Sequence, residues 1–140
     1  MNYWMVKQEP SSYSFDDFSN DGATDWSGVR NYQARNNLMA MKKGDKVLFY
    51  HSGDEKAVVG HATVSKPQFP DPTDEAWVAV VLSAGKKFKK PVLLSAIKAN
   101  LALKDIALVK NSRLSVLPLT KDEYDEVVSM LQRKPISLPN

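Results

Sequence analysis

The residues best suited to bind a ligand lie together in one stretch of the chain, from Trp26 to Asn37. Trp26 is followed by Ser27 and Gly28, a pair typical of a turn. Guanidinium and amide groups can read the edge of a planar polar ring, and an indole can cover the face of such a ring. The stretch therefore predicts a pocket for a flat, polar, aromatic ligand. Its edge-reading side chains are Arg30, Asn31, Gln33, Arg35, Asn36 and Asn37.

The same stretch admits a purely structural interpretation. A tryptophan beside a turn can cap the hydrophobic core, and asparagines next to a helix can cap its ends. The apolar residues Ala34, Leu38 and Met41 have helical spacing, which predicts a helix over residues 31–41, with Gly44 just past its end. Both interpretations stay open from these residues alone.

Positive charge is concentrated in the later part of the chain. The net charge is only +3, and acidic residues outnumber basic ones up to Arg30. A basic face with aromatic residues nearby is typical of a nucleic-acid-binding surface; the alternative is a solvated edge without a ligand. The densest basic cluster is Lys86-Lys87-Phe88-Lys89-Lys90, and Lys98, Lys104, Lys110 and Arg113 follow it.

The composition leaves little material for catalysis. The chain has no cysteine, and His51 and His61 are its only histidines. Disulfides, thiolate nucleophiles and cysteine-ligated zinc are thereby excluded. We find no glycine loop typical of phosphate binding, and we expect no metal and no cofactor. The enzyme alternative acts on nucleic acid or a nucleotide with His51 as general base, whereas we interpret His61 as structural.

Length and hydropathy indicate one soluble domain. A chain of 140 residues suits a single domain with a sizeable core. The longest apolar run, 76–82, is much shorter than the ~20 residues of a membrane-spanning helix. We therefore expect residues 1–140 to form one domain with a proline-containing tail from about residue 134. We also expect a cytoplasmic monomer that binds no membrane.

Short strands and helices must position these residues. Long helical crossovers are largely missing, so we expect a mixed α/β (α+β) domain with a curved, mainly antiparallel sheet flanked by short helices. Capping boxes at Ser14 with Asp17 and at Thr120 with Glu123 predict the starts of two helices. The predicted strands are 3–7, 46–51, 57–64, 77–82 and 114–117, and a further helix covers 95–100.

Three positions interrupt this pattern of elements. Gly60 inside a strand predicts a bulge or the close approach of another backbone. Residues 67–72, which hold three prolines, are predicted to form an irregular loop. Residues 89–92, which contain Pro91, are expected to break the strand pattern.

Several segments resemble the sequence blocks of EVE domains, which belong to the PUA-like superfamily. Tyr3-Trp4-Met5-Val6-Lys7-Gln8-Glu9-Pro10 is similar to their opening strand and turn, and residues 26–36 are similar to their central signature. Phe49-Tyr50-His51-Ser52 is similar to a third block, and residues 69–73 and 113–118 also match. The chain departs from the family at two positions. The family commonly has Ser where Gln8 stands, and Asp or Thr where Ser27 stands.

The resemblance implies a PUA-like pseudobarrel, and the scarcity of catalytic residues favours a module that binds nucleic acid without catalysis. It implies a pocket for a methylated or hydroxymethylated base, such as 5-methylcytosine in DNA, with RNA as a second candidate. A base inside a duplex cannot be enclosed, so such a protein must flip the base out or bind a single strand. The pocket then needs aromatic walls, and groups that hydrogen-bond the base edge.

The resemblance and the residue types together give a set of candidate site residues. Trp26 is the first candidate for an aromatic wall, with Tyr50 and Trp4 as second candidates unless they are core residues. The candidates for reading the base edge or shaping the pocket are Lys7, Gln8, Ser27, Asn31 and His51, of which Asn31 is also explained as a helix cap and His51 by a structural hydrogen bond. The candidate phosphate contacts are Arg30, Arg35, Lys86, Lys87, Lys89, Lys90 and Arg113.

Overall fold

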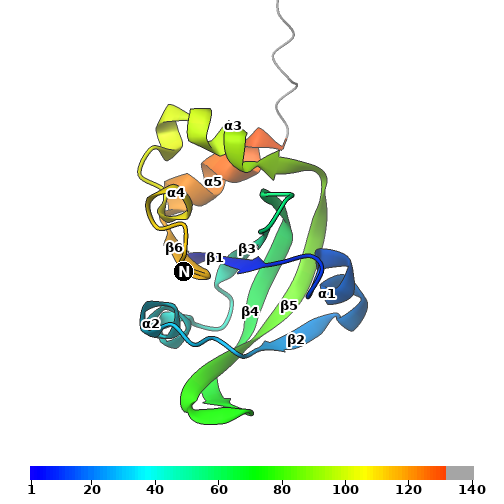
Figure 1. Cartoon of the computed structure of the whole chain (residues 1–140), viewed down its shortest axis with the longest axis vertical. Coiled ribbons are helices and arrows are strands. Elements are labelled where there is room, and N and C mark those ends of the chain that lie inside the picture. Colours follow the sequence, from blue (N-terminus) through cyan, green and yellow to red (C-terminus); the bar gives the residue numbers. More distant parts are fainter. Residues whose placement is uncertain (132–140) are drawn as a thin grey trace, which may run out of the picture.

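The computed structural model describes residues 1–131 and contains one curved sheet with short helices around it (Figure 1). The strands are β1 (Tyr3–Gln8), β2 (Ala23–Trp26), β3 (Lys46–His51), β4 (Ala57–Asp71), β5 (Asp74–Leu93) and β6 (Val116–Leu119). The helices are α1 (Phe15–Asp21), α2 (Tyr32–Ala40), α3 (Leu94–Ala99), the 3₁₀ turn η1 (Leu101–Leu103), α4 (Ala107–Lys110) and α5 (Lys121–Met130).

The strands are arranged in the order β2-β5-β4-β3-β1-β6. Only β1 and β3 pair in parallel within the described residues, and the other neighbours are antiparallel. Helix α2 lies at one end of this curved sheet, while α3, α4 and α5 gather at the other (Figure 1). This confirms the predicted mixed α/β fold with a curved, mainly antiparallel sheet flanked by short helices.

The core covers both faces of the β1–β3 pair, and one of these faces is rich in aromatic residues. The Phe49 ring on β3 lies 5.3 Å from Phe15 and 5.4 Å from Phe18, measured between ring centroids. The Trp26 ring at the end of β2 lies 5.6 Å from Phe49. Helix α1 and strand β2 therefore pack against the same side of β3.

The opposite face of β1 packs against the C-terminal helices. The Tyr3 ring contacts Tyr124 of α5, with the ring centroids 4.9 Å apart. Because side chains alternate along a strand, Tyr3, Met5 and Lys7 share this face, and Gln8 belongs to the other.

The capping signals in the sequence predicted the helix starts correctly. The Ser14 side chain accepts a hydrogen bond from the Asp17 amide, and the Asp17 side chain accepts one from the Ser14 amide. Thr120 and Glu123 form the same box before α5. The predicted helix at 31–41 is confirmed as α2, with Asn31 as N-cap, although it ends at Met41 without using Gly44.

Strand β2 and the lengths of β4 and β5 depart from the prediction. Residues 67–71 form the last part of β4 instead of an irregular loop, with Phe69 paired to Ala79 and Pro70 to Val78, and Pro72 lies in the turn that follows. Residues 89–92 likewise stay within β5. Repeated register shifts between the two strands accommodate the prolines, because a bulge leaves positions that need no ladder hydrogen bond.

The bulge predicted at Gly60 is confirmed, whereas the group that approaches this glycine is a side chain and not another backbone. The β4–β5 register shifts on both sides of this residue. A Cβ atom added to Gly60 would lie 2.4 Å from the Phe15 ring, so α1 can approach β4 only over a glycine. The close approach comes from an aromatic side chain of the core.

The predicted C-terminal tail lies outside the described residues. Within residues 1–131, no helix is long and apolar enough to cross a membrane.

Candidate functional site

A small cavity of about 180 Å³ opens where the end of β1, the entry to α1 and strand β2 meet. We refer to it as the Trp26 cavity. Its volume is smaller than the roughly 300–1,000 Å³ of sites for drug-sized ligands, and it suits one flat ring better than a larger molecule. Its lining residues are Gln8, Tyr13, Thr24, Asp25, Trp26 and Ser27.

Trp26 belongs both to the core and to this cavity. Its side chain is only 4% exposed, and it packs edge-on against Phe49, Phe18 and Tyr13. The remaining surface of the residue lines the cavity. The structural and the ligand-binding interpretations of Trp26 are therefore compatible, because the core holds the indole rigidly at the cavity wall.

Tyr13 is a second aromatic residue of the cavity, and the sequence analysis did not identify it. Its hydroxyl donates a hydrogen bond to Asp21 Oδ2 at 2.7 Å. Burial, together with this hydrogen bond, raises the pKa of Tyr13 to about 12. The ring therefore stays neutral at physiological pH. The signal that could have found it is its position directly before the N-cap Ser14, where an apolar residue commonly packs against the helix.

The polar side chains of the cavity offer both donors and acceptors. Gln8 brings an amide, Thr24 and Ser27 bring hydroxyl groups, and Asp25 brings a carboxylate. Such a set can hydrogen-bond the edge of a heterocycle while the aromatic side chains contact its apolar surface. The arrangement is that of a binding site for a planar polar ring.

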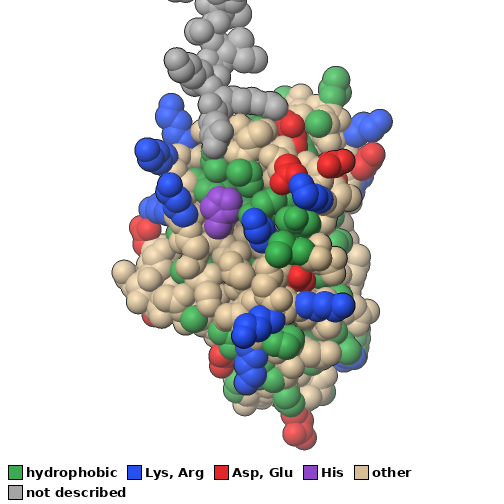
Figure 2. Space-filling view, turned by 180° about the vertical axis from the view of Figure 1, so that it is seen from behind, with side chains coloured by type: hydrophobic (Ala, Val, Ile, Leu, Met, Phe, Trp, Pro, Cys, Tyr) green, Lys and Arg blue, Asp and Glu red, His purple; other side chains and the backbone are tan. Residues whose placement is uncertain are grey.

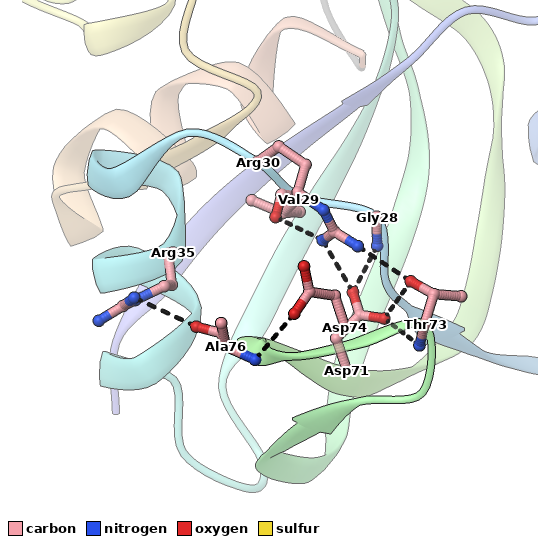
Figure 3. Close-up of polar contacts among 8 residues, drawn as sticks. All are labelled: Gly28, Val29, Arg30, Arg35, Asp71, Thr73, Asp74 and Ala76. Atoms are coloured by element: carbon pink, nitrogen blue, oxygen red, sulfur yellow. Dashed lines mark hydrogen bonds and ion pairs between the residues drawn. The ribbon is translucent and has the colours of Figure 1, made fainter.

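Residues 27–31, which follow the cavity, are anchored to the β4–β5 hairpin by Asp71 (Figure 3). The Asp71 carboxylate accepts hydrogen bonds from the Gly28 amide at 2.8 Å and from Arg30 Nη1 at 3.1 Å. Its other oxygen accepts from the amide and the hydroxyl of Thr73. Gly28 has a φ of 78°, a conformation that favours glycine at this anchored turn. The anchor fixes the backbone next to Ser27.

The Asp71 carboxylate remains charged inside the protein. Burial alone would raise its pKa, but hydrogen bonds from Thr73, Gly28 and Arg30 outweigh burial and hold the pKa well below its usual range. Arg30, which also donates to the Val29 carbonyl and to the Thr73 hydroxyl, is therefore largely occupied within the protein. The side chain is still 39% exposed, and a phosphate contact by Arg30 stays a prediction.

Lys7 and Tyr50 do not reach the Trp26 cavity. They are paired neighbours on β1 and β3, and their side chains line a separate cavity of about 340 Å³. Lys7 Nζ donates to the Ser112 carbonyl at 2.9 Å and lies 5.8 Å from the centre of the Tyr50 ring. Burial lowers the pKa of Lys7 and raises that of Tyr50. The expectation of one pocket holding both residues together with Trp26 is wrong, because strand alternation directs them to the other face.

Trp4 and His51 have structural partners. Trp4 Nε1 donates to Asp45 Oδ2 at 3.0 Å, near the start of β1 and away from the cavity. His51 Nε2 accepts from the Phe15 amide at 3.0 Å, so its Nδ1 carries the proton that faces Glu55 at 2.8 Å. With both ring nitrogens engaged and 7% of the residue exposed, His51 has no free nitrogen to act as a general base.

The remaining candidates of the Trp26 stretch lie along α2. Asn31 accepts a hydrogen bond from the Ala34 amide and is exposed, as expected for a helix cap. Arg35 donates to the Ala76 carbonyl at 3.3 Å (Figure 3). Neither residue lines the Trp26 cavity.

The lysine cluster of β5 borders a different part of the surface. Seen from behind, basic side chains gather along one edge of the molecule, beside a histidine and an apolar patch (Figure 2). Lys87 pairs with Asp16 at 2.7 Å, and Lys90 is exposed. Arg113 is also exposed, in the segment between α4 and β6. Lys86, Lys87 and Lys89 line a cavity of about 320 Å³ together with His61, Phe88, Val128 and Leu131.

His61 has the structural environment that the sequence analysis proposed for it. Its Nδ1 lies 3.2 Å from the Tyr124 hydroxyl, and its ring packs edge-on against Phe88. Among residues 1–131, no group of three potential metal ligands comes together.

Comparison with known proteins gives consistent matches over almost the whole chain. The family model described as EVE domain matches residues 2–130. Thymocyte nuclear protein 1 of Gallus gallus is 34% identical over 95% of this chain and 70% of its own length. The crystal structure of protein Atu2648 from Agrobacterium tumefaciens is 42% identical, with a TM-score of 0.92 and full coverage of both chains. The human THYN1 protein, solved in complex with 5-methylcytosine containing DNA, is 29% identical, with a TM-score of 0.91 over 96% of this chain and 100% of its own.

Proposed function

Because the chain belongs to the EVE domain family, we propose that it is a nucleic-acid-binding module that holds a single modified base in the Trp26 cavity. The human relative was solved with 5-methylcytosine containing DNA, which supports DNA as the partner and a methylated base as the ligand. The module binds without catalysis, as a monomer, and RNA is the second candidate partner.

The observation that carries this proposal is the convergence of Gln8, Trp26 and Ser27 on one small cavity. Gln8 is 18 positions or more away from the other two residues in the chain. The indole of Trp26 is packed rigidly against the core. A cavity of about 180 Å³ can enclose a single ring, but only after that ring has left its stack. The ligand is therefore a base flipped out of a duplex or exposed in a single strand.

Recognition of the modification must combine shape with hydrogen bonds. A methyl group that fills an apolar corner contributes roughly 0.8 kcal/mol, which is about fourfold in affinity. Stacking adds little discrimination, since every base has a π-face. A larger preference requires contacts to the base edge, and Gln8, Thr24, Asp25 and Ser27 are the side chains of the cavity that can make them.

The test is a binding panel of oligonucleotides that are identical except at one base. The central position carries cytosine, 5-methylcytosine, 5-hydroxymethylcytosine, adenine or a methylated adenine, in single-stranded and duplex DNA and in RNA. We expect at least one modified base to bind about fourfold or more tightly than its unmodified form. Equal affinity for all bases in every context would overturn the proposal.

A further inference from the structure

An exposed aromatic pair lies beside the anchored loop that follows the Trp26 cavity. The rings of Tyr32 and Trp77 stack with their centroids 5.1 Å apart and their planes 30° from parallel. Tyr32 is the first residue of α2 and is 70% exposed, whereas Trp77 on β5 is half-buried. A tyrosine this exposed contributes little to the core, so folding alone does not explain its place on Trp77.

Two arginines lie against the rings of this pair. The Arg35 guanidinium lies 5.6 Å from the centre of the Tyr32 ring and 5.8 Å from that of Trp77. The Arg30 guanidinium lies 5.5 Å from the centre of Trp77. We refer to Arg30, Tyr32, Arg35 and Trp77 together as the Tyr32 platform.

Hydrogen bonds within the protein hold the two arginines of the platform before any ligand arrives. Arg30 is fixed by Asp71 and Thr73, and Arg35 is tied to the Ala76 carbonyl (Figure 3). Fixed side chains lose little conformational entropy when a ligand binds to them. The platform therefore offers a preformed aromatic surface at low entropic cost.

The two arginines differ in how their charge is balanced. Arg30 is paired with the carboxylate of Asp71. Arg35 has no carboxylate partner within residues 1–131, and its Nε is buried without a hydrogen bond. The platform thus combines an exposed ring with one uncompensated positive charge, which suits an aromatic ligand joined to a phosphate.

The Tyr32 platform lies close to the Trp26 cavity, both along strand β5 and along the amino-acid sequence. Trp26 pairs with Val80 of β5, and Trp77 stands three residues before Val80, about 10 Å along the part of β5 that extends beyond β2. Because the separation is an odd number of residues, Trp77 faces the other side of β5 from Val80 and Trp26, and the nucleic-acid strand passes from one site to the other around this edge of the sheet. In the chain, residues 28–31 alone separate the cavity residue Ser27 from Tyr32. A nucleotide one or two positions from the base in the cavity can therefore reach the platform.

We propose that the Tyr32 platform stacks an unpaired base that flanks the modified base on the same strand, with Arg35 facing the adjoining phosphate. The inference rests on the proposed function, and it adds a second contact between the protein and the bound nucleic-acid strand. Because every base has a π-face, this contact strengthens binding without reading sequence or modification. The cavity then supplies selectivity, while the platform supplies affinity.

The test measures the affinity of the full chain for a short single strand that carries the preferred modified base. Tyr32→Ala removes the exposed ring, and we expect affinity to fall by roughly 5- to 150-fold, equally for the modified and the unmodified base. Tyr32→Phe keeps the ring and should bind like the wild type. Met39→Ala is the matched control, since it removes another exposed apolar side chain of α2 and should leave affinity unchanged.

A second arm replaces each nucleotide flanking the modified base, in turn, by an abasic site. One such site should weaken binding to the wild type by about the same factor as Tyr32→Ala, and should have no further effect on the Tyr32→Ala variant. The proposed stacking on the Tyr32 platform is refuted if the wild type prefers a modified base while Tyr32→Ala binds like the wild type. It is also refuted if abasic sites weaken binding to both proteins equally. If the wild type binds no oligonucleotide, or binds all bases alike, the proposed function itself has failed.

Discussion

Lys7 and Gln8 are consecutive residues of β1, yet their side chains line two different cavities on opposite faces of the sheet. Gln8 shares its cavity with Trp26, while Lys7 shares the other with Tyr50. The alternation of side chains along a strand separates them, although they are neighbours in a block that resembles the family pattern. Only the Gln8 side of β1 therefore belongs to the proposed base site.

The opposite orientation of Lys7 and Gln8 allows variants in the Trp26 cavity to be compared with a control variant on the other face of the sheet. Gln8→Ala removes an amide from the Trp26 cavity, and Ser27→Ala removes a hydroxyl. We expect each to change the ranking of bases in an oligonucleotide panel more than the average affinity, as the loss of a base-edge contact does. Lys7→Gln, one residue away on the other face, should leave the ranking unchanged. Equal losses for every base in the Gln8 and Ser27 variants would contradict this division.

Trp26 requires a variant that separates its two roles. Trp26→Ala should destabilise the fold by about 3–5 kcal/mol, because it empties a core position packed against Phe49 and Phe18. Trp26→Leu keeps an apolar side chain at this position but lacks a π-face, so it should weaken binding of all bases by roughly 1–3 kcal/mol. Trp26→Phe serves as the aromatic control and should retain most of the affinity. Urea unfolding beside the titrations verifies that each variant is folded, and unchanged affinity in Trp26→Leu would remove Trp26 as a wall.

Local signals in the sequence were sufficient for most helices and for the mixed fold. Ser14 and Thr120 mark helix starts because capping is decided within a few residues. The helical spacing of Ala34 and Leu38 identified α2 for the same reason. The special role of Gly60 could also be predicted, because a glycine inside a strand weakens it and often marks a bulge or a close approach.

The cavity could be predicted only in part, because it depends on pairing between distant segments. Strand β2 is short and polar, and it exists through its register with residues 80–83 of β5, which no local pattern shows. Asp71 is one acidic residue among many in the sequence, and only the fold brings Gly28 and Arg30 to it. The separation of Lys7 from Gln8, in contrast, follows from strand alternation and was predictable.

Salt dependence should report how many phosphates the domain contacts. Neutralising Z phosphates of duplex DNA gives a slope near −0.9Z when log affinity is plotted against log salt. We expect about two to four contacts for a domain of this size. Lys89→Gln should lower the magnitude of the slope by roughly 0.9 if the β5 cluster contacts the strand. Lys87→Gln should lower it less, because Lys87 is already paired with Asp16. A slope near zero in the wild type would argue for a free nucleotide or another small ligand.

Asp71 should make the free energy of unfolding depend on pH, and the Asp71→Asn substitution should remove this dependence. Its pKa is lowered in the folded protein, so its contribution is fully present above the unfolded value of about 4 and is lost as pH falls through the folded pKa. Asp71→Asn should therefore be less stable than the wild type by about 2–4 kcal/mol at pH 7, with the gap closing progressively below about pH 4. Urea unfolding at pH 7, 4 and 2.5 measures this gap. Asp74→Asn, on the same hairpin but exposed, should differ little from the wild type in unfolding free energy at any pH. A constant difference between Asp71→Asn and the wild type down to pH 2.5 would show that the charge of Asp71 does not stabilise the anchor.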